Sequence, residues 1–163
     1  MRRFALIAVG IFIVWLALAG RLTLAEVVTG ALVAAGVAAL SRHHLALLDD
    51  IRLTPMLPVH LARYFWTFFI ALVGANLDVA RRVISPKPDI HPALVEVRTA
   101  LTSDLGKLWL ANSITLTPGT LSVDVVGDIL KVHWIDATPG RDMEHATRAI
   151  AEKFEARLKG FLS

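Results

Sequence analysis

Three long apolar stretches occupy the first half of the chain, at residues 4–20, 22–40 and 57–80. A segment that enters lipid has to satisfy its own backbone hydrogen bonds, and about 17–25 apolar residues in a helix are enough to cross a bilayer. The first stretch has no charged residue and is just long enough to cross. The pattern therefore predicts a transmembrane region at residues 1–84, made of two to three helices.

The second and third stretches are less uniform than the first. Glu26 and many small residues make insertion of residues 22–40 marginal, so this stretch either crosses or lies half-immersed against the first. The third carries Arg63 near its start and Asp78 near its end, with Tyr64 and Trp66 suited to the membrane interface. We interpret Arg63 and Asp78 as anchors at the helix ends, because an ion path would need a charge nearer the centre.

The N-terminus also has the features of a secretory signal peptide. Arg2 and Arg3 precede an apolar core, and Ala17-Leu18-Ala19 imitates a cleavage site. A second apolar stretch follows at once, so we expect the first to be retained. The distribution of basic residues weakly favours a cytoplasmic C-terminal domain. The side of the N-terminus and the crossing of residues 22–40 stay open.

A change of pattern marks the start of a second domain, expected at residues 85–163. Three prolines in Ser85–Pro92 end the helix and predict an extended linker. Beyond it, alternating apolar residues and helical spacing predict the order strand, helix, strand, strand, helix, a small α+β domain. The expected ranges are 94–97, 102–112, 121–125, 130–134 and 141–159.

Two local features support this order. Gly127-Asp128 fits a two-residue turn between the second and third strands. The last helix carries an apolar stripe and ion pairs four residues apart, Glu144 with Arg148 and Glu155 with Lys159, which we expect on its solvent face. The stripe consists of Met143, Ala146, Ile150, Phe154 and Leu158.

The polar run Asn112–Leu121 follows an apolar helical segment directly. Pro118-Gly119 fits the two central positions of a type II turn, because glycine tolerates the positive φ required there. The neighbouring hydroxyls can satisfy backbone groups at a helix end. One interpretation is a helix stop and a turn into the hairpin; the other is a site that docks on a neighbouring subunit. The candidate docking residues are Asn112, Ser113, Thr115, Thr117, Pro118, Gly119 and Thr120.

Composition argues against several other functions. The chain has no cysteine, which removes thiolate metal sites and thiol catalysis. The net charge of +3 comes without an aromatic-studded basic groove, so nucleic-acid binding is not expected. His43-His44 with Asp49-Asp50 lacks the spacing of ligands on one helix face. We therefore expect no enzyme activity, no metal and no cofactor.

The motifs from Ser85 onwards resemble the E-type subunits of the Mrp-type multisubunit cation/proton antiporters, the MnhE/MrpE family. The resemblance rests on SPKPDIHP at 85–92, LANSITLTPGTLSVDV at 110–125 and VHWID at 132–136, and its layout covers the whole chain. It implies a multi-pass protein of the inner (plasma) membrane with a cytoplasmic C-terminal domain. Its partners would be large membrane subunits, similar to those of respiratory complex I, and small membrane subunits.

The resemblance also implies a function: an accessory subunit in a complex that exchanges Na⁺, or K⁺ in some relatives, for H⁺ and supports pH homeostasis. The ion, the stoichiometry and any contact of this subunit with the ion path stay open. Composition alone equally permits a stand-alone membrane-anchored adaptor whose α+β domain binds a partner protein. A lone transporter is not expected, because two or three helices without a central carboxylate do not build an alternating-access path.

Overall fold

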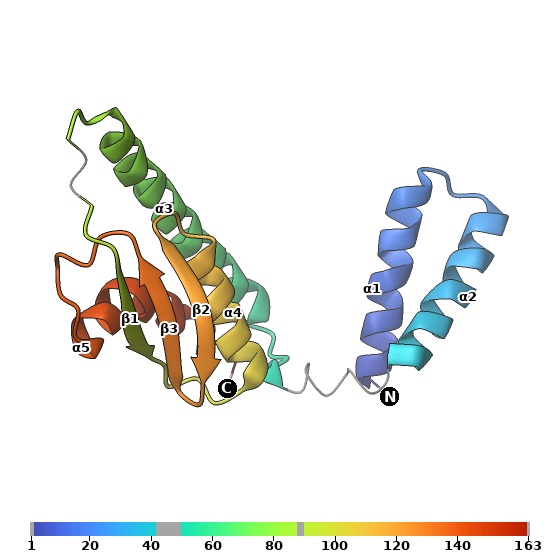
Figure 1. The fold of residues 1–163 in the computed structure, drawn as a ribbon. Coiled ribbons are helices and arrows are strands. Elements are labelled where there is room, and N and C mark those ends of the chain that lie inside the picture. Colours follow the sequence, from blue (N-terminus) through green and yellow to red (C-terminus); the bar gives the residue numbers. More distant parts are fainter. Residues whose placement is uncertain (1, 42–49, 88–89, 163) are drawn as a thin grey trace. The chain divides into compact units, whose positions relative to one another are not determined.

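The computed structural model describes residues 2–41, 50–87 and 90–162 (Figure 1). The chain divides into two compact units, Met1–Asp49 and Asp50–Ser163. Among the described residues, Leu57–Ile84 is the one helix that is both long and apolar enough to cross a membrane, while Ile7–Ala19 and Leu24–Leu40 are shorter apolar helices. The cluster His43-His44 lies outside the described residues.

The first unit is a pair of helices, α1 (Arg2–Ala19) and α2 (Leu24–Leu40). Gly20 has a φ of 64°, the left-handed conformation that ends a helix without strain for glycine. The side chain of Thr23 accepts a hydrogen bond from the Glu26 N–H at 3.3 Å and caps the start of α2. Glu26 therefore lies in the first turn of α2, near the loop.

Small residues bring α1 and α2 close together. Gly30, Ala34 and Ala38 recur every four residues on α2 and are its buried residues. A Cβ atom on Gly30 would lie 2.5 Å from the indole of Trp15. The indole of Trp15 thus packs directly on the backbone of α2 at Gly30. Small residues at the contact between two helices are typical of helix pairs in membranes, where packing replaces the hydrophobic effect.

The second unit contains a three-stranded antiparallel sheet of β1 (Ala93–Arg98), β2 (Thr120–Val126) and β3 (Ile129–Trp134). The order is β1-β3-β2, so β3 lies in the centre. Val95 and Val97 face Val132 and Leu130 across the ladder, and all four side chains are buried. Gly127, with a φ of 63°, begins the tight turn between β2 and β3. The small sheet with helices agrees with the expected element order.

The edge strand β2 differs from its expected alternation. A β-bulge interrupts its register between Ser122 and Asp124. Ser122 points towards α4 (Asp104–Thr115), where its hydroxyl donates to the carbonyl of Ala111 at 2.9 Å. Leu121 and Val123 are consequently more than half exposed. The apolar residues of β2 thus do not add to the core as those of β1 and β3 do.

The closing helix runs through α5 (Met143–Ala146), a π-helical stretch η2 (Thr147–Ala151) and α6 (Glu152–Leu158). Its buried residues recur every four positions, a spacing longer than the 3.6-residue period of an α-helix. The π-helical stretch has more residues per turn and so keeps these residues on one face. The buried members of the expected stripe are Ala146, Ile150, Phe154 and Leu158.

The expectation that Glu155 lies on the solvent face is wrong. Glu155 is 9% exposed. It accepts hydrogen bonds from the Thr99 hydroxyl at 2.8 Å and the Ala100 N–H at 3.2 Å, and Lys159 lies 2.7 Å away. Burial raises the pKa of the Glu155 carboxyl. Hydrogen bonds from Lys159, Thr99 and Ala100 together lower the pKa by more than burial raises it, so the net shift is downward. The carboxylate ties the end of β1 to the closing helix.

The third apolar segment, α3 (Leu57–Ile84), belongs to the sheet-containing unit and packs within it. Figure 1 shows it running beside the sheet and α4. The described chain thus divides into packing units near residue 50. The expected boundary at residue 84 is of another kind, because it separates a transmembrane region from a cytoplasmic domain. That boundary stays a prediction.

Candidate docking site

The turn inside the polar run has the predicted geometry. The Thr120 N–H donates to the Thr117 carbonyl at 3.2 Å, and Gly119 has a φ of 92°. With Pro118 before it, Gly119 occupies the position of a type II turn that requires positive φ. A Cβ atom there would lie 2.9 Å from Cγ2 of Ile135. Both the conformation and the close contact require glycine.

Most hydroxyls of the run bond inside the unit. Ser113 donates to the Trp109 carbonyl at 2.7 Å, and Thr117 donates to the Ser113 carbonyl at 2.9 Å. Thr120 donates to the Ile114 carbonyl at 2.6 Å. The bonds to the carbonyls of Ser113 and Ile114 satisfy the end of α4, as expected for a helix stop. The helix-stop interpretation therefore accounts for much of the run.

One of these hydroxyls also holds α3. The Tyr64 hydroxyl lies 2.7 Å from Oγ of Ser113, and both residues are buried. Because Ser113 donates its proton to Trp109, Tyr64 is the donor to Ser113. The ring of Tyr64 also packs edge-on against Trp109 at 5.7 Å. Ser113 of the polar run thus holds a residue of α3 that lies 49 positions earlier in the chain.

The candidate residues divide by exposure into three groups. Ser113 and Thr117 are buried, so the structure does not present them to a partner. Thr115 is exposed and accepts a hydrogen bond from the Ser122 N–H at 3.0 Å. Asn112 is exposed on α4. The turn residues, from Pro118 to Thr120, are half-buried.

The turn borders a hollow of about 220 Å³ between α3, the loop after β3 and the closing helix. Charged side chains of both signs line it, and burial lowers the pKa of the Lys153 ammonium among them. The hollow has polar and apolar walls, as a surface for a protein contact would. Its charged lining residues are Asp78, Arg82, Asp136 and Lys153.

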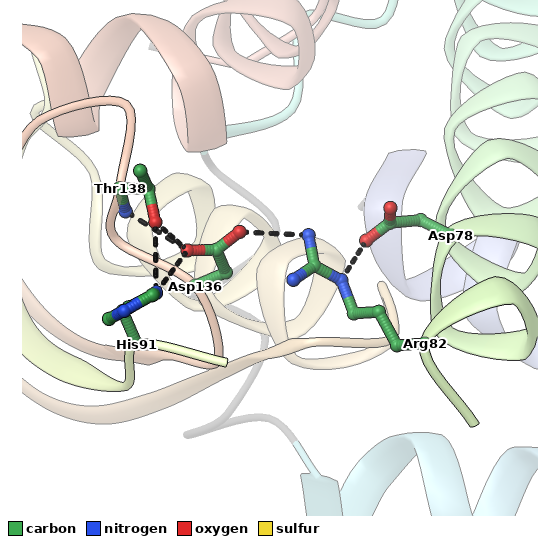
Figure 2. A network of polar contacts seen from close by, with 5 residues as sticks. All are labelled: Asp78, Arg82, His91, Asp136 and Thr138. Carbon is green, nitrogen blue, oxygen red and sulfur yellow. Dashed lines mark hydrogen bonds and ion pairs between the residues drawn. The ribbon is translucent and has the colours of Figure 1, made fainter. Parts of the chain in front are cut away.

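Arg82, at the end of α3, is the centre of a polar network beside this hollow (Figure 2). Its guanidinium contacts Asp78 at 2.8 Å and Asp136 at 2.9 Å. Asp136 also accepts hydrogen bonds from the hydroxyl and the backbone N–H of Thr138, and His91 lies 3.9 Å away. The network joins the end of α3, the linker and the loop after β3.

Asp136 makes this network sensitive to pH. Hydrogen bonds from Thr138 lower the pKa of the Asp136 carboxyl most; Arg82 lowers it further, while partial burial opposes them. A folded-state pKa below the unfolded value of about 4 means that the stabilisation is present above pH 4 and is lost as pH falls through the folded pKa.

Asp136→Asn should therefore lower the thermal midpoint of the full chain in detergent at pH 7, and lower it less towards the acid end of a pH 3–7 series. The side-chain contacts of Asp136 with Arg82 and His91 depend on the carboxylate, whereas the substituted amide is uncharged throughout. Thermal unfolding followed by near-ultraviolet circular dichroism gives both midpoints. A difference that is constant from pH 3 to 7 would contradict the linkage.

Sequence reasoning missed the Arg82–Asp136 ion pair and the burial of Glu155. Arg82 and Asp136 lie 54 positions apart, and no periodicity links them. Asp78 and Arg82 are spaced i,i+4, which is the one local signal for part of the network. In the part of the chain that the structure describes, no three His, Asp or Glu residues form a group able to hold a metal ion. The network is suited to holding the end of α3 against the loop after β3 and to contacting another protein.

Comparison with known proteins identifies the family. A protein family described as Na⁺/H⁺ ion antiporter subunit matches residues 8–160. The chain therefore belongs to this family, the MnhE/MrpE family.

Two curated relatives are named as E-type subunits of a Na(+)/H(+) antiporter. The one from Alkalihalophilus pseudofirmus is 41% identical over 93 residues, 56% of this chain and 57% of the relative. The one from Bacillus subtilis is 36% identical over 103 residues, 62% of this chain and 63% of the relative. The chain thus matches somewhat under two thirds of the length of each relative.

A solved structure resembles nearly the whole chain. It is a chain of the membrane-bound sulfane sulfur reductase, an archaeal respiratory membrane complex. The two share 38% sequence identity and a TM-score of 0.84 over 98% of each chain. The layout of α1 and α2 followed by the sheet-containing unit is therefore shared with a chain of a membrane complex.

Proposed function

We propose that this chain is the E-type accessory subunit of a multisubunit antiporter that exchanges a monovalent cation, Na⁺ or K⁺, for H⁺ across the cell membrane. The family match over residues 8–160 carries the proposal. The names of the two curated relatives support it. The chain would serve cation efflux and pH homeostasis through the complex, with no catalytic step of its own.

The membrane region of the proposal consists of α1 and α2, and residues 85–163 lie in the cytoplasm. The apolar composition of both helices and their close packing through Gly30 and Ala34 support membrane placement. Within the described part of these helices, Glu26 is the one carboxylate, and it lies in the first turn of α2. The position of Glu26 supports an assembly role, with the ion path in other subunits.

A mild-detergent pull-down of the tagged full chain from its native membrane tests the proposal. Recovery of large membrane antiporter subunits in fixed proportion is the expected result. Recovery of the chain alone, or with soluble proteins only, would overturn it and favour a membrane-anchored adaptor.

The similarity to a chain of a respiratory membrane complex gives a second candidate function. It extends over 98% of the chain, more than either curated relative covers. In this alternative the chain is the corresponding subunit of a respiratory membrane complex. Co-purification of redox subunits in the same pull-down would assign the chain to such a complex.

We also propose that the half-buried turn of the polar run, at Pro118, docks on a neighbouring subunit together with the adjoining hollow. Pro118→Arg places a charge there while leaving the buried hydroxyls in position. It is expected to lower recovery of partner subunits by about tenfold, which corresponds to about 1.4 kcal/mol. Asp128→Arg, in the turn at the other end of β2, is the control. Unchanged recovery with Pro118→Arg would count against docking.

A further inference from the structure

Helix α3 has two apolar faces of different character. Its inner face packs into the core of the sheet-containing unit, and its outer face is open. The inner face includes Leu57, Leu61, Tyr64, Phe68 and Ala71. The exposed apolar residues of the outer face are Val59, Trp66, Phe69, Ile70, Val73, Leu77 and Ile84.

The inner face contacts the rest of the sheet-containing unit along almost the whole length of α3. Near the start, Gly160 lies so close to the ring of His60 that a Cβ atom would be 2.6 Å from it. Further along, Arg157 donates to the Thr67 hydroxyl at 3.2 Å. At the end, Arg82 contacts Asp136. From His60 to Arg82 a helix rises about 33 Å, as long as the hydrocarbon core of a bilayer is thick.

This attachment is incompatible with α3 crossing a bilayer. A crossing α3 would carry the sheet and its helices into the hydrocarbon core beside it. The side chains of Glu144 and Arg148 in that unit are 80% and 61% exposed. Charged groups and open sheet edges do not face hydrocarbon. Length and composition favour a transmembrane α3, but its packing does not.

The outer face has the chemistry of the membrane interface. Trp66 is 65% exposed and stacks on Phe69, with ring centroids 6.3 Å apart. At 100° per residue, Arg63 and Arg81 fall together along one border of this face, and both are exposed. Aromatic residues with arginines at the border suit the headgroup region of anionic lipids.

The apolar surface continues onto α4. Leu108 and Leu116 are 58% and 62% exposed. Together with Phe65 of α3 they line a shallow groove between the two helices. An apolar surface that extends over two neighbouring helices suits a flat partner such as a bilayer.

We propose that α3 lies along the membrane surface, with its outer face immersed in the lipid interface and the sheet on its other side. Only α1 and α2 would then cross. Eight of the nine Lys and Arg residues from Arg2 to Lys87 would lie on the cytoplasmic side, and only Arg21 outside, in agreement with the positive-inside rule. The inference rests on the membrane placement of α1 and α2 but not on the antiporter function.

The absence of native cysteines allows a direct test of the topology with single cysteines. Met56 and Ile84 flank α3 and are 54% and 82% exposed, and Leu22, between α1 and α2, is 80% exposed. In native membranes, a membrane-impermeant maleimide should label Met56→Cys and Ile84→Cys from the same, cytoplasmic side. Leu22→Cys should be labelled from the opposite side. Labelling of the first two from opposite sides would overturn the proposal.

Spin labels measure how deep the outer face lies. With the full chain in anionic phospholipid vesicles, labels at Val59→Cys, Ile70→Cys and Ile84→Cys should all lie at a similar depth of about 5–10 Å. Leu32→Cys, exposed on α2, is the deep control. A crossing α3 would instead place position 70 near the bilayer centre, about 15 Å deep, and the other two near its surfaces.

The accessibility of the same spin labels to two relaxing agents tests whether lipid covers the outer face. Labels accessible to oxygen but shielded from a water-soluble relaxing agent support lipid contact. Labels shielded from both would show that protein covers the outer face and would overturn the lipid assignment. Failure of the pull-down to recover antiporter subunits would overturn the proposed function and leave these measurements unaffected.

Discussion

Phe154→Ala is expected to lower the free energy of unfolding of the sheet-containing unit by about 3–5 kcal/mol, the usual cost of deleting a buried phenylalanine ring. Phe154 is 1% exposed. Its ring lies 6.2 Å from that of Phe68 on α3, so it packs the closing helix against α3. The deletion removes contacts on both sides and leaves a cavity that a close-packed core does not refill.

The test compares Phe154→Ala with Phe69→Ala in the full chain in detergent. Phe69 is the same residue type on the outer face of α3, where it is 55% exposed. Phe154→Ala should lower the thermal midpoint by about 10 °C or more and Phe69→Ala by only a few degrees. Equal shifts would show that the closing helix and α3 do not share a core.

Gly119→Ala is expected to cost about 2–5 kcal/mol in free energy of unfolding. An L-residue at positive φ costs about 1–2 kcal/mol, and forcing a methyl group into an occupied space costs about 1–3 kcal/mol. Here the φ is 92°, and the added carbon would lie 2.9 Å from Ile135. Ile135 is held in turn, since its N–H donates to the Gly119 carbonyl at 2.8 Å.

Gly127→Ala separates the two contributions. Gly127 also has positive φ, 63°, but a Cβ atom there meets nothing within 4 Å. It should show the conformational cost of about 1–2 kcal/mol without the packing cost. Thermal unfolding of both variants gives the difference. If Gly127→Ala were as destabilising as Gly119→Ala, the contact with Ile135 would carry no energy.

The element order of the C-terminal domain follows from local sequence. The alternation around Leu130 and the pair Gly127-Asp128 predict two strands and their turn, because both signals depend only on neighbouring residues. The type II turn at Pro118-Gly119 is predictable for the same reason. The structure confirms the expected order of strand, helix, strand, strand, helix.

What sequence reasoning missed depends on residues far apart in the chain. The apolar residues of α3 predict a membrane segment equally well whether they face lipid or a protein core, because composition is the same in both cases. Its two faces are distinguished by contacts between distant residues, such as that of Tyr64 with Ser113. The expectation for Glu155 was wrong because Glu155 borders the buried stripe, and its partners Thr99 and Ala100 lie more than 50 positions earlier in the chain.

The bulge in β2 bears on how the protein avoids self-association. An edge strand offers unpaired N–H and C=O groups to any other chain, and a flat apolar edge invites fibril-like stacking. β2 carries exposed Leu121 and Val123 at such an edge. The irregularity between Ser122 and Asp124 twists this edge and breaks the even spacing that a foreign strand would need. The same bulge places Val125 opposite the buried Leu130, so one irregularity both sets the register of β2 and protects the sheet from growing beyond three strands.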